Sequence, residues 1–282
     1  MKKLMKSLFK NKMAVIGLAI ILLFILLSIV GPCLSPYSPN SDSLALRLRA
    51  PGYVDEEGNA YLLGTDYLGR DILTRILYGG RISISVGFAA TALSMLIGTF
   101  LGLISGLFGK GVDTVIMRLA DIQLSFPFIL LAVVAAALLK PSMSSIIFIL
   151  ALSGWVRFTR LVRSEVLVLR EKEFVQAAKA IGVPTWLTII RYLLPNVASS
   201  IIIMATLEMS RMIIMEATLG FLGLGIPAPT PTWGGMLSDG RSYFTSAWWV
   251  SVFPGLAIFF LVFGINLVGD WFRDYLDPKL DA

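Results

Sequence analysis

The sequence predicts an all-α integral membrane protein that crosses the bilayer six times, with both chain ends on the cytoplasmic side. Hydrophobic residues make up 56% of the 282 positions, and charged residues make up only 15%. A water-soluble domain of this size could not bury so much apolar surface, whereas a bilayer can accommodate it. Six apolar stretches also approach or exceed the roughly 20 residues that a helix needs to cross the hydrocarbon core.

The six predicted spans are joined by connections of very different lengths. They cover residues 13–30, 82–108, 122–139, 141–156, about 196–220 and 242–269. Only Lys140 and Pro141 connect the third span to the fourth, so these two are expected to form a tight helical hairpin. Pro127 is expected to mark the start of a helix, because a helix tolerates proline in its first turn.

Residues 1–80 are predicted to form an anchor helix followed by a segment outside the membrane. Five lysines before the first span resemble the start of a signal peptide: Lys2, Lys3, Lys6, Lys10 and Lys12. The apolar run after them is too long for a signal peptide and no clear cleavage site follows, so we expect the anchor to be retained. Asp71 is expected to cap a short amphipathic helix at the membrane interface. A catalytic role for Asp66, Arg70 and Asp71 is disfavoured, because no nucleophile or metal-binding group accompanies them.

The positions of lysine and arginine predict the orientation of the chain. With both termini in the cytoplasm, 16 of the 24 basic residues fall in cytoplasmic segments, in agreement with the enrichment of such residues on that side. The transmembrane core then covers residues 81–270 and contains a basic cytoplasmic loop at residues 157–195. Residues 271–282 form a cytoplasmic tail.

The second span carries a glycine pattern. Gly98, Gly102 and Gly106 recur every four residues and therefore share one helix face. Without side chains on that face, a neighbouring helix can approach closely. We favour this packing role over a role in lining a pore.

The fifth span contains charged residues. Glu208 and Arg211 are three residues apart near its middle, and Glu216 lies closer to its outer end. Each charge costs about 2.5 to 3.5 kcal/mol at the bilayer centre, so these side chains should face protein or water. Glu208 and Arg211 either form an internal ion pair or, with Glu216, line a translocation path or gate; the sequence supports both interpretations equally.

The segment after the fifth span, residues 219–236, is rich in glycine and proline, which excludes a long regular helix. We expect an irregular outside loop, with Trp233, Trp248 and Trp249 anchored at the membrane interface.

Residues 173–195 form a charged, partly apolar segment between two spans. Phe174, Ala177, Ala178 and Ile181 share a helical face, and residues 182–184 (Gly-Val-Pro) interrupt the helix. A second short helix is expected to lead to the proline at position 195, at the mouth of the fifth span. The two helices predict a compact knob on the cytoplasmic face, in which small residues let another surface approach. An interfacial helix that lies on lipid fits the pattern equally well.

This segment resembles the cytoplasmic loop signature of ABC importer permeases. The signature reads Glu-Ala-Ala, three residues, Gly, nine residues, Ile, any residue and Leu-Pro. The matching positions here are Gln176, Ala177, Ala178, Gly182, Tyr192, Leu194 and Pro195. Two positions depart from the signature, because Gln176 replaces the acid and Tyr192 replaces isoleucine. Any contact that needs a carboxylate at position 176 is therefore absent.

Other motifs narrow the resemblance to the dipeptide/oligopeptide/nickel permease family, and within it to the C-type subunit. They are LGTDYLGRDILTR at 63–75, DIQLSFP at 121–127, LGFLGLG with the following PTPTWG, and NLVGDWFRDYLDP near the C-terminus. The resemblance covers nearly the whole chain in order. It implies a type I ABC importer permease fold in a bacterial cytoplasmic (inner) membrane.

The resemblance also implies partners and a mechanism. A homologous second permease subunit would complete the pathway, two ABC ATPase subunits would bind beneath it, and an extracytoplasmic solute-binding protein would deliver substrate. ATP and Mg would be bound by the ATPases and no cofactor by this chain, which has no Gly-x4-Gly-Lys-Ser/Thr run to hold phosphates. The family imports dipeptides, oligopeptides, glutathione-like peptides, nickel or metal chelates. The absence of histidine favours peptides over free nickel.

Composition disfavours other functions. The chain has no histidine and a single cysteine, Cys33, so the commonest acid–base group is missing and no intramolecular disulfide can form. An intramembrane enzyme is therefore disfavoured, and so is nucleic-acid binding, because no basic patch is interleaved with aromatic residues. The main alternative is an ion-gradient-driven secondary transporter that uses the charges of the fifth span, although no internal repeat is visible.

Overall fold

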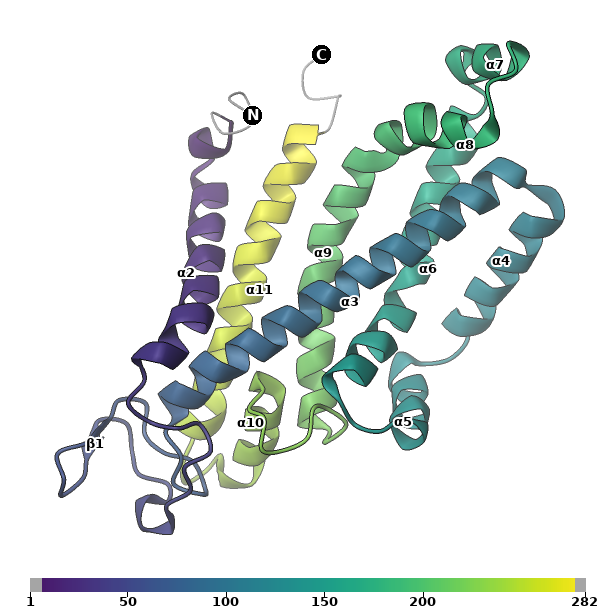
Figure 1. Cartoon of the computed structure of the whole chain (residues 1–282). Helices are drawn as coiled ribbons and strands as arrows, with labels where there is room; N and C mark the ends of the chain where they lie inside the picture. The colour runs from purple at the N-terminus through teal and green to yellow at the C-terminus, as the bar shows by residue number, and fades with distance from the viewer. Residues whose placement is uncertain (1–6, 277–282) are drawn as a thin grey trace.

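The computed structural model describes residues 7–276, which form a bundle of long helices with a small irregular region at one end (Figure 1). Lys2, Lys3, Lys6 and residues 277–282 of the predicted tail lie outside the described residues. The helices are α2 (Lys12–Leu34), α3 (Ile72–Phe108), α4 (Lys110–Leu124), α5 (Phe128–Leu138), α6 (Met143–Leu169), α7 (Glu173–Ala180), α8 (Thr185–Thr188), α9 (Leu194–Phe221), α10 (Trp233–Gly240) and α11 (Trp249–Leu276). Two short antiparallel strands, β1 (Tyr53–Val54) and β2 (Ala60–Tyr61), lie between α2 and α3.

Among the described residues, five helices are long and apolar enough to cross a membrane: α2, α3, α6, the continuous helix over Thr185–Phe221 that includes α8 and α9, and α11. The span predicted over residues 122–139 is not a single helix. α4 and α5 form a bent pair that meets at an angle of 92°, and the count reaches six if this pair is taken as one span. Pro127 lies at the break in an extended conformation and caps α5. Proline cannot continue the preceding helix because it has no N–H to donate, so its predicted position at a helix start is confirmed.

The predicted short interfacial helix is wrong as a separate element. Asp71 caps a helix as expected, accepting a hydrogen bond from the Thr74 N–H at 2.7 Å. That helix is α3, which continues without a break to Phe108. Gly79 and Gly80 do not interrupt α3, because it packs there against Trp233 so closely that a Cβ would lie 3.3 Å or less from the indole. Tertiary packing overrides their weak helix propensity.

The packing role of the glycines in the second span is confirmed. A Cβ at Gly98 would lie 2.5 Å from the Trp155 carbonyl oxygen, and one at Gly102 would lie 2.7 Å from the Val162 Cβ. Gly106 meets Val166 in the same way. The three glycines therefore let α6 lie directly against α3, and the two helices cross side by side in Figure 1. Core residues fill the remainder of this contact.

The segment after α9 folds back against the bundle, and the predicted interfacial role of its tryptophans needs correction. Trp233, on α10, is only 1% exposed and lies in the core beside Ile72 and Ile213. Its indole N–H donates to the Ile76 carbonyl oxygen at 2.9 Å. Trp249 is also buried, and only Trp248, at 48% exposed, can meet a membrane interface. The glycine-rich stretch around Trp233 lets α10 pack deeply, which draws the indole inward.

The bundle has two distinct ends. The beginning of α2, the end of α11, and helices α7 and α8 lie at one end, which we call the α7–α8 end (Figure 1). The strands, α5 and α10 lie at the other end. Both ends of the described chain are therefore on the same side, as six crossings require.

Candidate functional site

The two short helices predicted in residues 173–195 are confirmed as α7 and α8, which protrude from the bundle (Figure 1). Gly182 separates them with a φ of +81°, a conformation that favours glycine. The Val183 N–H donates to the Ala178 carbonyl oxygen at 3.0 Å and closes the end of α7. Pro184 is the N-cap of α8. The bend between the helices is thus built from local backbone chemistry.

One face of α7 attaches it to the bundle. Val175 and Ala178 are buried, and Val175 belongs to a core cluster with Val166 and Leu193. Ala178 is only 3% exposed, so it lies on the side of α7 that packs against the bundle. An eight-residue helix with apolar residues on several faces does not reveal from its sequence which one faces inward. Here the face that carries Val175 and Ala178, which are three residues apart, turns toward the bundle.

The α7–α8 pair and the turn that follows it also carry exposed apolar residues, and we call the surface that they form the outer face. Ile181 is 80% exposed and Trp186 is 62% exposed. Phe174, Ala177 and Ile190 are also exposed. Such a concentration of exposed apolar residues at one end of the bundle is typical of a surface that contacts a partner or the membrane interface.

The remaining signature residues shape the connection to α9. The Gln176 side-chain amide donates to the Arg170 carbonyl oxygen at 2.8 Å and so joins α7 to the end of α6. A carboxylate could not make this bond, which gives the amide at this position a structural use. Tyr192 lies 6.3 Å from the ring of Phe174, measured between centroids, whereas Leu194 and Pro195 are exposed.

The second short helix is not separate from the fifth span, in contrast to the prediction. A π-helical turn over Ile189–Leu193 joins α8 to α9, and Pro195 lies in the first turn of α9. Proline lacks an N–H and crowds the carbonyl four residues before it. The wider π-helical turn directly before Pro195 accommodates this, so the chain stays helical from Thr185 to Phe221.

Most arginines near the knob bind residues of the bundle. The guanidinium–carboxylate or guanidinium–carbonyl contacts are Arg157–Glu208 (3.2 Å), Arg160–Asp121 (2.6 Å), Arg163–Asp113 (2.5 Å) and Arg170–Gly106 (3.1 Å). These contacts tie α6 to α3, α4 and α9. The basic charge in this region therefore stabilises the bundle.

The charged residues of the fifth span lie inside the bundle. Arg211 donates to Glu208 at 2.8 Å, which confirms the internal ion pair, and Arg157 on α6 reaches the other carboxylate oxygen of Glu208. Glu216 is 1% exposed, and neither of its oxygens has a hydrogen-bond partner among the described residues. The structure thus joins Glu208 to two arginines and leaves Glu216 apart from them.

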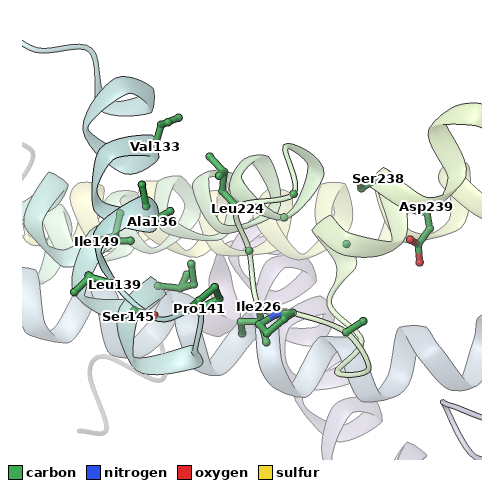
Figure 2. Close-up of a pocket in the computed structure, with 18 residues that line it drawn as sticks. Val133, Ala136, Leu139, Pro141, Ser145, Ile149, Leu224, Ile226, Ser238 and Asp239 are labelled. Atoms are coloured by element: carbon green, nitrogen blue, oxygen red, sulfur yellow. The ribbon is translucent and has the colours of Figure 1, made fainter.

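A cavity of about 540 Å³ lies at the end of the bundle opposite the α7–α8 pair. Figure 2 shows its walls, formed by α5, the start of α6, the loop after α9, and α10. Most lining side chains are apolar, such as Val133, Ile149 and Ile226. Asp239 is the charged residue among them. No property of the sequence near Asp239 marks it out, because the cavity forms from segments that are distant in the chain.

Asp239 also belongs to a buried network of ion pairs. Arg70 contacts Asp66 at 2.7 Å and Asp239 at 3.3 Å, and Arg75 contacts the same two carboxylates at 3.6 and 3.4 Å. Asp66 additionally accepts hydrogen bonds from the N–H groups of Leu68 and Arg70. Burial raises the pKa of Asp239, and the two arginines oppose this rise. The network fixes α10 to the segment before α3.

The long apolar helices and the protruding helical pair define a multi-pass membrane protein. Residues 98–282 match the family described as binding-protein-dependent transport system inner membrane component, and residues 1–51 match the N-terminal transmembrane domain of oligopeptide transport permease C. The chain belongs to the first of these families, the multi-pass inner-membrane permeases of ABC importers. Because the chain belongs to this family, an ABC importer permease is favoured over the alternative of an ion-gradient-driven secondary transporter.

Curated relatives match over nearly the full chain. The dipeptide transport system permease protein DppC of Alkalihalophilus pseudofirmus is 46% identical over 277 residues, which are 98% of this chain and 89% of the relative. The oligopeptide transport system permease protein OppC of Bacillus subtilis is 40% identical over 270 residues, which are 96% of this chain and 87% of that protein.

Solved structures support the type I ABC importer permease fold. An inward-facing structure of the MetNI methionine ABC transporter aligns with a TM-score of 0.60 at 18% identity, over 72% of this chain and 96% of that chain. A crystal structure of an amino acid ABC transporter with histidines aligns with a TM-score of 0.56 at 13% identity, over 72% of this chain and 94% of that one. At such low identity these alignments concern the fold alone.

Proposed function

We propose that this chain is one permease subunit of an ATP-driven importer of short peptides. Relatives at 46% and 40% identity carry dipeptide and oligopeptide permease names, and they align over almost the whole chain. The structural observation that carries the proposal is the outer face of α7 and α8. It exposes apolar residues beyond the bundle, where a soluble partner can bind them.

In this proposal the outer face seats in a cleft of an ABC ATPase subunit. That partner binds ATP and Mg, and its closure pushes on α7 and α8. The continuous helix from Thr185 to Phe221 passes this push directly to the fifth span. The buried side of α7 passes it to α6 through Val166. A homologous second permease and a second ATPase complete the assembly, a solute-binding protein delivers peptide from outside, and the α7–α8 end faces the cytoplasm.

The charges of the fifth span have a secondary place in this proposal. Glu208, Arg211 and Glu216 lie between the two ends of the bundle, where a translocation path or gate would run. Their ion pairing supplies a structural role for Glu208 and Arg211. Glu216, which has no such pair among the described residues, is the better candidate for a residue that acts during transport.

Cysteine crosslinking tests the coupling surface, and the structure supplies a matched pair of positions. With Cys33 replaced by serine, Ala177→Cys places a thiol on the outer face, whereas Ala178→Cys places one on the buried face. We expect a bifunctional reagent to join the first variant, but not the second, to a co-purified ATPase subunit. The transporting complex should form with both.

The two positions are adjacent in the sequence but lie on different faces of α7. If α7 were merely close to the ATPase, without a defined contact surface, both variants would crosslink. A transporting complex in which Ala177→Cys forms no crosslink, or in which both variants crosslink equally, would contradict the coupling assignment. Peptide uptake by the same complex should cease when ATP is depleted.

A further inference from the structure

The cavity beside α10 has the chemistry of a small-molecule site. Its volume of about 540 Å³ lies within the range of roughly 300 to 1,000 Å³ typical of ligand pockets. Apolar side chains, including Leu139, Leu224 and Ile226, form its walls, and Gly223, Gly225 and Gly235 bring bare backbone to its surface. Such a surface accepts apolar side chains and offers backbone groups for hydrogen bonding.

The charge of the cavity is confined to one carboxylate. Among the lining residues, Ser145 and Ser238 are polar and Asp239 is the one that carries a charge. Ser145 already donates its hydroxyl to backbone carbonyls of its own turn. Figure 2 shows Ser238 and Asp239 together on α10, across from the apolar residues of α5 and α6.

The contacts of Asp239 leave capacity for a ligand. Both arginine contacts go to Oδ2, at 3.3 Å from Arg70 and 3.4 Å from Arg75, so Oδ1 lies outside both ion pairs. The Asp239 side chain is 28% exposed. Asp66 takes the shorter contact of 2.7 Å with Arg70 and two backbone N–H groups. The Tyr67 side chain is a further hydrogen-bonding neighbour of Asp239, and Asp239 is nevertheless the more exposed of the two carboxylates, since the Asp66 side chain is 3% exposed.

The surrounding charge favours a cation. Asp42 approaches Arg70 at 3.8 Å, so the ion-pair network contains three carboxylates and two guanidinium groups. Arg241, two residues after Asp239, lies over the ring of Phe221, where it keeps its positive charge but stays outside these ion pairs. The network therefore has a net negative charge next to an otherwise apolar cavity.

The wall that presents Asp239 is held in place. A Cβ at Gly234 would lie 2.5 Å from the Ala217 carbonyl oxygen, so α10 packs directly against the backbone of α9. Trp233 is buried and hydrogen-bonded to α3. A carboxylate on so firmly packed a helix is preorganised, which lowers the entropic cost of binding.

From this geometry we propose that the cavity binds the amino-terminal part of a short peptide, with Asp239 accepting the α-ammonium group and the apolar walls accepting the first side chains. This inference rests on the proposed function of peptide import. A bare metal ion fits the site less well, because hard cations require several oxygen ligands and no group of three metal-binding side chains exists in the described part of the chain. The cavity lies at the end that faces the outside in the proposed orientation, where an arriving peptide first meets the permease.

A binding experiment on the purified transporter complex, without the solute-binding protein, tests the inference. The probes are tritiated alanyl-phenylalanine and its N-acetyl derivative, which lacks the ammonium charge. We expect the complex to bind the free dipeptide roughly tenfold more tightly, as a charge-assisted hydrogen bond allows. Asp239→Asn should remove this preference, and Asp239→Glu should retain most of it.

Asp42→Asn is the matched control. It removes a carboxylate that contacts the same Arg70 but does not line the cavity, so the preference for the free amino group should survive. Size-exclusion profiles of the variants establish that the complex is intact. A preference that persists in Asp239→Asn, or that disappears equally in Asp42→Asn, overturns the role of Asp239.

Peptide uptake by the complete system separates failure of this inference from failure of the proposed function. Wild-type uptake of dipeptide with equal binding of the two probes, or with no binding at all, overturns the inference alone. Absence of dipeptide uptake by the complete system overturns both.

Discussion

Glu208 lies in the middle of the helix that forms the fifth span, and two arginines reach it from different directions. Arg211 follows it by one helical turn and contacts one carboxylate oxygen at 2.8 Å, and Arg157 contacts the other from α6 at 3.2 Å. A buried carboxylate without partners would cost several kcal/mol. The ion pairs therefore make the charge tolerable and also join α9 to α6.

We expect a double-mutant cycle with Glu208→Gln and Arg211→Met to show a coupling energy of roughly 1 to 3 kcal/mol. Glu208→Gln removes the carboxylate that pairs with Arg211, and Arg211→Met leaves the buried Glu208 with Arg157 as its remaining ion-pair partner. The free energies of unfolding can be measured by titration with sodium dodecyl sulfate. The pair Asp121 and Arg160 is the control, since its side chains are about half exposed. Exposed pairs contribute little, so its coupling should stay below roughly 1 kcal/mol. Equal coupling in both cycles would argue against a buried, structural ion pair at Glu208.

For individual residues, the sequence predicted contacts within one helix well and contacts between helices poorly. The spacing of Glu208 and Arg211 offered their ion pair as one of two equally supported interpretations, because residues three apart share a helix face, and the structure shows that the pair forms. The contact from Arg157 depends on how α6 packs against α9, which the spacing does not contain. Ala178 shows the same limit: helical periodicity places it on a face with Ala177, but packing of Val175 decides which residues turn inward.

Among the helices, α3 and α6 make the most intimate contact, and glycine makes it possible. The glycines of α3 remove side chains along one stripe, so that α6 approaches to backbone distance. Without a hydrophobic driving force between helices in lipid, such close van der Waals packing is a main source of association. The α3–α6 pair is therefore a closely packed contact at the centre of the bundle's stability.

We expect Gly98→Ala to destabilise the protein by roughly 1 to 3 kcal/mol, the usual cost of overpacking. The added Cβ would lie 2.5 Å from both the Trp155 carbonyl oxygen and the Phe158 Cβ, and neither is the free end of a flexible side chain. Gly111→Ala is the matched control, because nothing lies within 4 Å of its added Cβ in the first turn of α4. That change should be neutral or slightly stabilising, since alanine favours a helix more than glycine.

Thermal unfolding of the two purified variants in one detergent provides the comparison. If Gly98→Ala melts at the same temperature as Gly111→Ala, the close approach of α3 and α6 is not a source of stability. Loss of transport with unchanged melting would instead support the pore-lining role that the sequence analysis disfavoured.

Helix breaks were the least predictable feature at the element scale. Pro127 and Gly182 mark real breaks, because a missing N–H and a positive φ end a helix locally. Pro195 and the pair Gly79–Gly80 do not break their helices. A π-helical turn accommodates Pro195, and packing against Trp233 stabilises the helix at Gly79 and Gly80. Local residue chemistry thus predicts where a helix can end, whereas the surrounding structure decides whether it does.

At the scale of the whole molecule, the two ends of the bundle differ in chemistry. One end presents the exposed apolar face of α7 and α8, and the other holds the cavity, the buried ion-pair network and the strand pair (Figure 1). The sequence predicted the multi-pass helical bundle and the position of the knob, because both depend on composition and local turn residues. It could not predict the cavity, whose walls come from α5, α6, α10 and the loop after α9.

The proposed function requires the α7–α8 end to face the cytoplasm, where ATP is available, and the end that holds the strands, α5 and α10 to face outside. The excess of lysine and arginine at the first end predicts the same orientation. We therefore expect a thiol at Ile181 to be shielded by the membrane in spheroplasts, and a thiol at Glu56 to be open to the medium. Both side chains are exposed, at the α7–α8 end and in the connection between β1 and β2 respectively.

Single-cysteine variants of a Cys33→Ser protein give the measurement, because Cys33 is exposed and would otherwise react. A membrane-impermeant maleimide should label Glu56→Cys in intact spheroplasts, and should label Ile181→Cys only after permeabilisation. Since both positions are solvent-exposed, a difference in labelling reports the side of the membrane and not burial. The reverse pattern would place the α7–α8 pair outside, away from any ATPase, and would remove the physical basis of the coupling mechanism.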